Sequence, residues 1–191
     1  MNYQDAKQQI NSYHAEITAL REKMRSAQGD AEPEVVQDYT FSGVDGPVQL
    51  SELFGANDTL FIVHNMGRSC RYCTLWADGL NGVIDHLQSR AAFAITSPDT
   101  PEVQQEFAKG RGWRVPIYSH AGTSFAEDMG YRNESGWHPG VSVFRRSDQG
   151  IVRISDTAFG PGDDFCSVWH LFDLMPEGPA GWQPQYQYAD A

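Results

Sequence analysis

The feature that most constrains the fold of this chain is a short apolar strand that leads into a closely spaced pair of cysteines. Residues 59–64 (TLFIVH) are nearly all apolar, which is typical of a strand buried on both faces. After a short loop, Cys70 and Cys73 stand at the start of a helix that we predict over residues 70–88. The pattern therefore predicts a strand–loop–helix unit with both thiols in the first turn of the helix.

The start of a helix favours a negatively charged group, which gives the cysteine pair a chemical interpretation. The unpaired N–H groups and the positive end of the helix dipole stabilise a thiolate at Cys70. Arg68 and Arg71 are basic neighbours and should stabilise the same thiolate. Cys73 lies on the same helical face, where it can attack a mixed disulfide formed at Cys70. We therefore predict that Cys70 is the nucleophile and Cys73 the resolving thiol.

Two other interpretations of the cysteine pair stay open at this point. A Cys-x-x-Cys pair is half of a zinc site, but a second pair of ligands at matching spacing is missing, and His64, His86 and Cys166 would have to complete the set. We therefore expect no metal. Alternatively, both thiols are inert core residues, because free cysteine is commonly buried.

Charge and composition exclude several classes of partner. The chain has 14 Lys and Arg against 25 Asp and Glu, a net charge of −11, so nucleic acid and membrane surfaces are poor partners. Three cysteines do not make a disulfide framework. The N-terminus does not read as a signal peptide, and the longest apolar runs are only long enough for strands. We expect a soluble protein of the reducing cytoplasm.

The rest of the chain alternates strands with helices. Beyond residues 59–64 and 70–88, we predict a hairpin over residues 39–50, strands at 91–96, 115–119, 141–145 and 151–154, and helices at 101–110 and 124–129. A last helix should begin at Asp163 or Asp164 and include Met175. This order favours an α/β fold with a mixed central sheet and helices on both faces.

Both ends of the chain extend beyond this core. Residues 1–30 form an amphipathic helix, to about residue 27, and a linker; residues 35–178 form the main domain; residues 179–191 form a tail that we expect to be loosely held. The helix carries an apolar stripe close to a coiled-coil repeat: Tyr3, Ala6, Ile10, Tyr13, Ile17, Leu20 and Met24. Such a stripe packs either on its own domain or in a homodimer.

The chain resembles the thioredoxin-like superfamily in residues 60–64 followed by Cys70-Arg71-Tyr72-Cys73, and in Trp137-His138-Pro139-Gly140-Val141 before a strand. That superfamily places a cis-proline opposite its active disulfide, so the resemblance makes Pro139 a candidate cis-proline. The alternative is a trans proline at the start of a strand.

More narrowly, almost the whole chain is similar to the bacterial thioredoxin-like proteins of domain-of-unknown-function family 899. The matching features include Tyr39-Thr40-Phe41, Leu50-Ser51-Glu52-Leu53-Phe54, Gly112-Trp113, Pro139-Gly140-Val141-Ser142-Val143-Phe144 and Leu174-Met175-Pro176-Glu177-Gly178. The resemblance implies a thioredoxin-like fold, related to peroxiredoxins, with no settled activity.

Departures from better-known relatives leave the substrate class open. Thioredoxins carry tryptophan where Ser69 stands, and glutaredoxins carry proline where Arg71 stands. Peroxiredoxins have a hydroxyl residue three positions before the reactive cysteine, whereas Gly67 stands three positions before Cys70.

Other residues near the motif could take part. His138, Tyr72 and Trp113 are candidates for docking the substrate, with loop and core positions as the alternative interpretations. Cys166 could resolve a sulfenic acid on Cys70, or simply fill space in the core. Asp78 could take a proton from Cys73, or face solvent.

The function expected from these residues is that of a thiol–disulfide oxidoreductase that acts on a protein or small-molecule thiol or disulfide and needs no bound cofactor. Two alternatives are a peroxiredoxin-like thiol peroxidase that uses Cys70, and a non-catalytic binding module that dimerises through the N-terminal helix.

Overall fold

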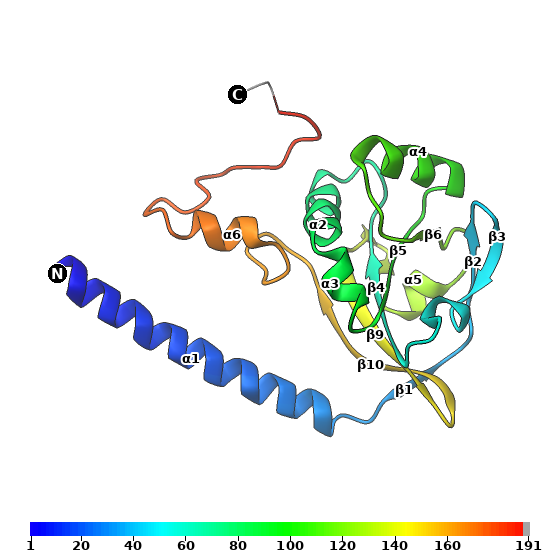
Figure 1. Cartoon of the computed structure of the whole chain (residues 1–191), viewed down its shortest axis with the longest axis horizontal. Helices are drawn as coiled ribbons and strands as arrows, with labels where there is room; N and C mark the ends of the chain where they lie inside the picture. The colour runs from blue at the N-terminus through cyan, green and yellow to red at the C-terminus, as the bar shows by residue number, and fades with distance from the viewer. Residues whose placement is uncertain (189–191) are drawn as a thin grey trace. The chain divides into compact units, whose positions relative to one another are not determined.

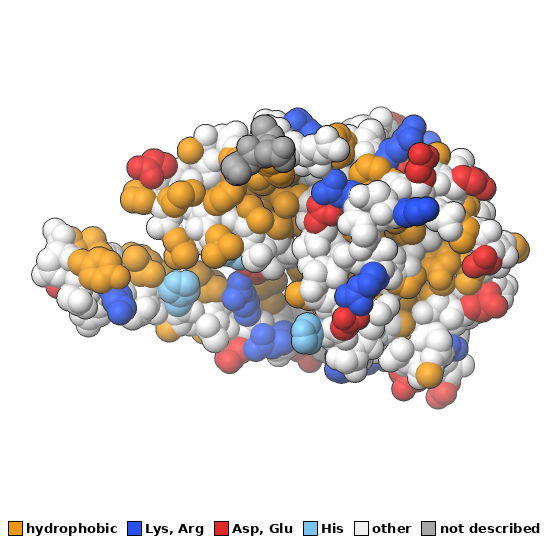
Figure 2. Space-filling model, turned by 45° about the horizontal axis from the view of Figure 1, so that its top comes forward, with side chains coloured by type: hydrophobic (Ala, Val, Ile, Leu, Met, Phe, Trp, Pro, Cys, Tyr) orange, Lys and Arg blue, Asp and Glu red, His pale blue; other side chains and the backbone are white. Residues whose placement is uncertain are grey.

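The computed structural model describes residues 1–188 of the chain and divides it into two compact units, Met1–Glu34 and the chain from Val35 onward (Figure 1). The first unit is a single helix, α1 (Tyr3–Asp30), which ends slightly later than predicted. It begins at Asn2, whose side-chain oxygen accepts the N–H of Asp5 at 3.0 Å. No residue of α1 is buried. Figure 2 shows hydrophobic side chains on the surface of this helix.

The second unit is built on an eight-stranded sheet with the order β1-β10-β9-β4-β5-β6-β2-β3. Its strands are β1 (Glu34–Val36), β2 (Thr40–Gly43), β3 (Gly46–Gln49), β4 (Thr59–His64), β5 (Ala92–Ser97), β6 (Ile117–Ser119), β9 (Gly140–Ser147) and β10 (Gly150–Ala158). β4, β5 and β6 are parallel, and β9 pairs with β4 in the antiparallel direction. A separate small hairpin joins β7 (Arg132–Asn133) to β8 (Gly136–Trp137).

Helices pack on both faces of this sheet, as predicted. They are α2 (Arg71–Gly82), α3 (Ile84–Gln88), α4 (Pro101–Arg111), α5 (Phe125–Asp128), α6 (Ser167–Phe172) and a 3₁₀ turn, η1 (Glu52–Phe54). Alternate residues of β4 point to opposite faces of the sheet and join two separate cores. Leu60 and Ile62 pack with Phe125 of α5, whereas Val63 packs with Trp76 of α2 and with residues of α3 and α6. The cysteine pair belongs to the second core.

The structure corrects several predicted boundaries. The helix predicted over residues 70–88 is two helices, because the chain leaves helical geometry at Val83. The last helix begins at Ser167 and ends before Met175. Asp163 does not cap it; its carboxylate accepts the N–H groups of Gly160 and Phe165 in the preceding loop. The strands β1, β7 and β8 were not predicted from the sequence.

Two residues of the C-terminal tail, Trp182 and Pro184, are packed, whereas the other described residues of the tail are exposed. Pro184 is fully buried, and Trp182 contacts the rings of Trp169 and Phe172 on α6. The remainder of the predicted tail, residues 189–191, lies outside the described residues. No helix in the described chain is both long and apolar enough to cross a membrane.

Candidate active site

The loop between β4 and α2 is shaped by two polar side chains. Asn65 accepts the N–H of Gly67 at 2.8 Å, and Asp99 accepts the N–H of Arg68 at 2.6 Å. Gly67 has a φ of +99°, and a Cβ there would lie 2.9 Å from the Asp99 carboxylate. Only glycine suits both the conformation and the space. The loop is therefore held in one shape that delivers Cys70 to the start of α2.

Cys70 is the residue that caps α2. Its sulfur accepts the backbone N–H of Cys73 at 3.0 Å, and its side chain is half-buried. The pKa of Cys70 is lowered from 9.0 to about 7, chiefly by a hydrogen bond from the Cys73 thiol, with help from the backbone N–H groups of Cys73 and Tyr72 and against the effect of burial. About half of this thiol is ionised near neutral pH.

Cys73 has the opposite character. It is 2% exposed, and its pKa is raised because its proton is shared with the Cys70 sulfur, because it is buried, and because it faces the negative charge on Cys70. The backbone N–H of Met66 donates to its sulfur at 3.5 Å. No disulfide links the three cysteines. The pair thus consists of an accessible thiolate and a buried thiol that keeps its proton.

The two predicted arginines lie on either side of Cys70. Both are exposed: Arg68 is fixed through its backbone to Asp99, and Arg71 donates from Nη2 to Gln183 Oε1 at 3.2 Å. The pKa of Cys70 is lowered by the hydrogen bonds described above rather than by either guanidinium. Their role in stabilising the thiolate stays a prediction.

Aromatic rings surround the pair on the α6 side. Tyr72 stacks on Trp169 with ring centres 6.3 Å apart, and it tilts against Trp76 at 6.2 Å. These rings share the second core with both cysteines of the motif and with Cys166, which is buried at the start of α6. Burial raises the pKa of the Cys166 thiol, which suits a packing residue better than a reactive one.

Trp113 and Asp78 belong to a neighbouring cluster. The indole N–H of Trp113 donates to Asp78 at 2.7 Å, and Arg111 Nε donates to the same carboxylate at 2.8 Å. The Trp113 ring also packs edge-on against Phe107 of α4. The Asp78 carboxylate thus accepts from Arg111 and Trp113, and the hydrogen bonds of the described residues include none from the Cys73 thiol to Asp78. We find no support for Asp78 as the proton acceptor of Cys73.

His138 and Pro139 lie at the same end of the sheet as the cysteine loop. Gly140, the next residue, pairs with His64 at the end of β4. No cis peptide bond occurs among the described residues, so Pro139 is trans and the cis interpretation is wrong. His138 Nε2 lies 3.0 Å from Asn133 Oδ1, which fixes the ring within the β7–β8 hairpin.

A buried polar cluster lies on the other face of β4. His64 Nε2 contacts Ser142 Oγ at 2.8 Å, and its ring stacks on Tyr131 with centres 3.8 Å apart. Burial, together with the charges of His120 and Arg153, lowers the pKa of His64 well below its usual value, so the ring is neutral. Among the residues that the structure describes, no group of three or more His, Cys, Asp or Glu could hold a metal ion.

Sequence reasoning missed three contributors to the site: Asp99, Gln183 and Tyr186. Asp99 had a detectable signal, because it follows β5, the parallel neighbour of β4, and the carboxyl ends of parallel strands meet at one edge. The sequence carried no signal for Gln183 or Tyr186, because their hydrogen bonds join residues more than 70 positions apart in the chain.

Comparisons with solved structures place the fold. The peroxidoxin BcpB of Mycobacterium tuberculosis is similar with a TM-score of 0.57 and 19% identity, over 66% of this chain and 84% of that one. The bacterioferritin comigratory protein of Xanthomonas campestris is similar with a TM-score of 0.54 and 14% identity, over 65% of this chain and 87% of that one. Reduced Prx3 of Vibrio vulnificus in complex with H2O2 is similar with a TM-score of 0.53 and 14% identity, over 70% of this chain and 90% of that one. At these identities the likeness shows the thioredoxin fold, which confirms the predicted fold class.

The sequence itself matches one family model. No curated protein matches the chain. The model described as "Bacterial protein of unknown function (DUF899)" matches residues 1–189. The chain, a thioredoxin-fold protein with a reduced Cys-x-x-Cys pair at the start of α2, therefore belongs to the DUF899 family.

Proposed function

We propose that this protein is a thiol–disulfide oxidoreductase in which Cys70 attacks and Cys73 resolves. The observation that carries the proposal is the inequality of the two thiols. Cys70 is half-buried with a pKa of about 7, whereas Cys73 is buried, keeps its proton and donates its N–H to the Cys70 sulfur at 3.0 Å. A dithiol enzyme needs one sulfur that reacts first and one that waits.

In the first step the Cys70 thiolate attacks one sulfur of a substrate disulfide. A bond forms between that sulfur and Cys70 Sγ, the substrate S–S bond breaks, and the other half leaves as a thiolate that takes a proton from water. Cys70 then no longer carries the negative charge that raises the pKa of Cys73. The resolving thiol becomes easier to ionise only after the mixed disulfide has formed.

In the second step Cys73 loses its proton to water and attacks Cys70 Sγ. The Met66 N–H, 3.5 Å from the Cys73 sulfur, stabilises the thiolate as it forms. The second half of the substrate leaves as a thiol, and Cys70 and Cys73 are joined in a disulfide. Two electrons have passed to the substrate, so an external dithiol must reduce the protein again. The scheme needs no bound cofactor, and it fits a reducing compartment such as the cytoplasm.

The test compares the wild type with Cys70→Ser and Cys73→Ser in the reduction of a small disulfide by dithiothreitol. We expect turnover in the wild type and none above background in Cys70→Ser. Incubated with the small disulfide alone, without dithiothreitol, Cys73→Ser should accumulate a mixed disulfide on Cys70, seen as the added mass of one substrate half. Equal turnover in the wild type and Cys70→Ser would refute the proposal.

A second candidate is a peroxiredoxin-like peroxidase, favoured by the fold shared with the three peroxiredoxins compared above. The Cys70 thiolate would attack the terminal oxygen of a hydroperoxide, release an alcohol or water, and become a sulfenic acid; Cys73 would then form the disulfide and release water. Against this candidate, Gly67 stands three positions before Cys70, where peroxiredoxins carry a hydroxyl side chain. Rapid trapping of a Cys70 sulfenic acid by one equivalent of peroxide would favour this candidate, and slow oxidation would exclude it.

The exposed stripe of α1 supports a proposal about partners. Six large hydrophobic residues of this helix are 44–76% exposed: Tyr3, Ile10, Tyr13, Ile17, Leu20 and Met24. An isolated helix gains most of its stability by packing an apolar face, and the near-heptad spacing suits a second copy. We propose a homodimer through α1. A purely structural dimer without redox activity would show the same association together with thiols inert to alkylation.

A further inference from the structure

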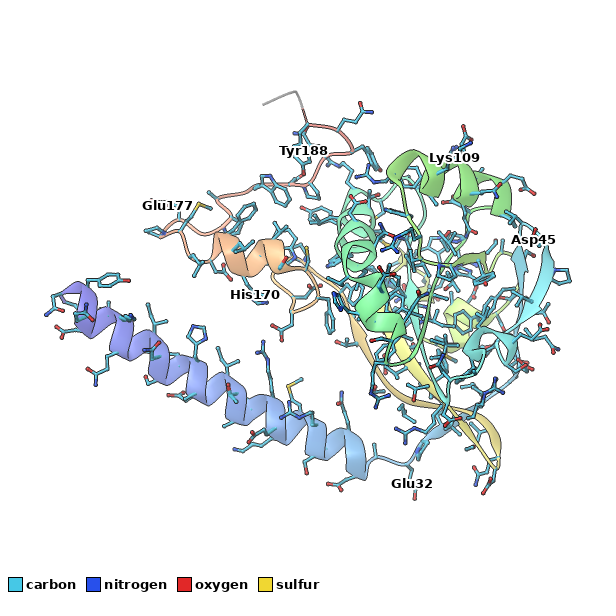
Figure 3. The ribbon with its side chains drawn as sticks, in the orientation of Figure 1. Glu32, Asp45, Lys109, His170, Glu177 and Tyr188 are labelled. Carbon is cyan, nitrogen blue, oxygen red and sulfur yellow. The ribbon has the colours of Figure 1, made fainter. Side chains whose placement is uncertain are left out.

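The segment that follows α6 turns back toward α2 and α4 (Figures 1 and 3). We call residues 179–188 the C-terminal strap. In Figure 3 the chain runs from the labelled Glu177, beyond α6, back to the labelled Tyr188. Its first anchor is Trp182, whose ring meets Trp169 edge-on at 5.7 Å and Phe172 at 5.0 Å. Pro184, two residues later, is fully buried. The strap is therefore fixed to α6 by apolar packing.

The middle of the strap contacts the residue next to the reactive thiol. Gln183 accepts a hydrogen bond at 3.2 Å from Arg71, the residue that follows Cys70. The pKa of Tyr186 is raised by burial and by the charges of Cys70 and Cys73, and lowered by Arg71, which means that its phenol is close enough to feel all three groups. The side chain of Gln183 thus borders the start of α2.

The far end of the strap is anchored on α4. Arg111 Nη1 donates to the backbone oxygen of Tyr186 at 3.0 Å, and the Tyr186 ring meets Phe107 edge-on at 6.4 Å. Arg111 is itself held by Asp78 of α2. A pocket of about 350 Å³ opens between this end and α4, with Arg68 in its wall. Its volume falls at the low end of the range for small-molecule sites.

A larger concavity, of about 990 Å³, lies between the β2–β3 hairpin and α4 and includes neither cysteine. That concavity is therefore not next to the reactive thiol, whereas the strap contacts Arg71, the residue that follows Cys70.

We propose that the C-terminal strap forms a fixed wall beside Cys70 that admits low-molecular-weight disulfides and excludes extended polypeptide chains. This inference rests on the proposed oxidoreductase function and names its substrate class. A protein disulfide brings several residues of chain on either side of its sulfurs, and these would need the surface that the strap occupies at α6, α2 and α4. A small disulfide needs only the half-buried sulfur of Cys70 and little of the surface around it. The pocket that Arg68 and Tyr186 line does not include Cys70, but Arg68 belongs to the loop that leads to it.

The test loosens the strap in the full-length protein with the double variant Trp182→Ala/Tyr186→Ala. The matched control is Leu174→Ala, a hydrophobic truncation at a residue that is 81% exposed and precedes the strap. Turnover is measured with bis(2-hydroxyethyl) disulfide and with insulin. Trp182 is half-buried, and loss of its ring contacts with Trp169 and Phe172, together with the contact of Tyr186 with Phe107, should make the open state of the strap about tenfold more populated. We expect the insulin-to-small-disulfide ratio to rise by about that factor in the double variant and to be unchanged in Leu174→Ala.

A second measurement needs no turnover. The rate at which Cys70 reacts with N-ethylmaleimide is compared with the rate for a maleimide that carries a long polyethylene glycol chain, by mass spectrometry of the Cys70 peptide. The wild type should discriminate strongly against the bulky reagent, and the double variant should lose about tenfold of that discrimination. If the double variant does not fold by circular dichroism, Tyr186→Ala alone serves.

Two results would overturn the inference: a wild type that reduces insulin as readily as the small disulfide, or a loosened strap that leaves the maleimide discrimination unchanged. Failure of the oxidoreductase proposal looks different. In that case neither disulfide is reduced in a Cys70-dependent way, while the maleimide comparison still decides whether the strap restricts access to Cys70.

Discussion

Replacing Cys73 with alanine should raise the pKa of the Cys70 thiol. The hydrogen bond from the Cys73 side chain is the largest cause of the lowered pKa of Cys70, ahead of the backbone N–H groups of Cys73 and Tyr72. Alanine removes the side-chain donor and leaves both backbone donors in place. Cys73→Ser keeps a hydroxyl donor at the same position and is the matched control, so its Cys70 should stay close to the wild-type pKa.

The magnitude follows from the thiolate fraction and from nucleophilicity. If the pKa of Cys70 returned fully from about 7 to 9.0, the ionised fraction at pH 7 would fall from about one half to about one per cent. A thiolate of higher pKa is the better nucleophile, by roughly eightfold over this interval. The rate of attack on a small disulfide at pH 7 should therefore fall by roughly sixfold. At pH 10, where Cys70 is almost fully ionised in the wild type and in the alanine variant, Cys70 of the variant should react roughly sevenfold faster.

The assay is the loss of free Cys70 thiol with a small symmetric disulfide between pH 5 and pH 10, read by mass spectrometry of the Cys70 peptide. Because only the thiolate reacts, each rate profile rises with pH through the pKa of Cys70. The wild-type and Cys73→Ser profiles should have midpoints near 7, and the alanine profile should lie at least about one unit higher and cross them near pH 8. Coincident midpoints in the alanine and serine variants, or a wild-type midpoint of 8.5 or above, would refute the reasoning.

Three further predictions concern stability and assembly. Gly140→Ala should lower the free energy of unfolding by about 1–3 kcal/mol in chemical denaturation, because a Cβ would lie 2.1 Å from the ring of Tyr131, whereas Gly79→Ala in α2, with nothing within 4 Å, should not destabilise the protein. Asp78→Ala should cost about 1 kcal/mol in the same assay, since it removes a partly exposed ion pair with Arg111 and the acceptor of the Trp113 indole N–H. No loss of stability would show that water replaces the carboxylate. Deletion of residues 1–34 should convert a dimer into a folded monomer in sedimentation experiments, and a full-length protein that is already monomeric would contradict the α1 interface.

The fold was largely predictable because its signals are local. The apolar run of β4, the buried strand β5 and the β2–β3 hairpin were each predicted from a few neighbouring residues. The hairpin turn lies one residue earlier than predicted, at Val44 and Asp45, because Gly46 already pairs with Gly43. The failures have local causes as well. The break at Val83 splits a pattern that is periodic on both sides, and β1, β7 and β8 are two or three residues long, too short for alternation to show.

The candidate site was predictable only in part. Cys70 and Cys73 share one turn of one helix, so their spacing alone implied contact. The wrong expectation for Pro139 came from a resemblance rather than from a physical signal in the sequence. The position of Asp78 on α2 was clear, but its partners, Arg111 and Trp113, come from another part of the chain.

The sequence by itself determined the unit on which everything else depends: a buried strand, a loop with Gly67, and two thiols in the first turn of a helix. These features follow from polarity and backbone preference over a few residues. Only the tertiary structure decided how far the burial and the pKa of the two thiols differ, because the burial of Cys73 depends on the packing of α2 against β4 and α6. It also decided that part of the tail, which reads as loose, is held on α6 by Trp182 and on Arg71 by Gln183, since these partners meet only after the chain has folded.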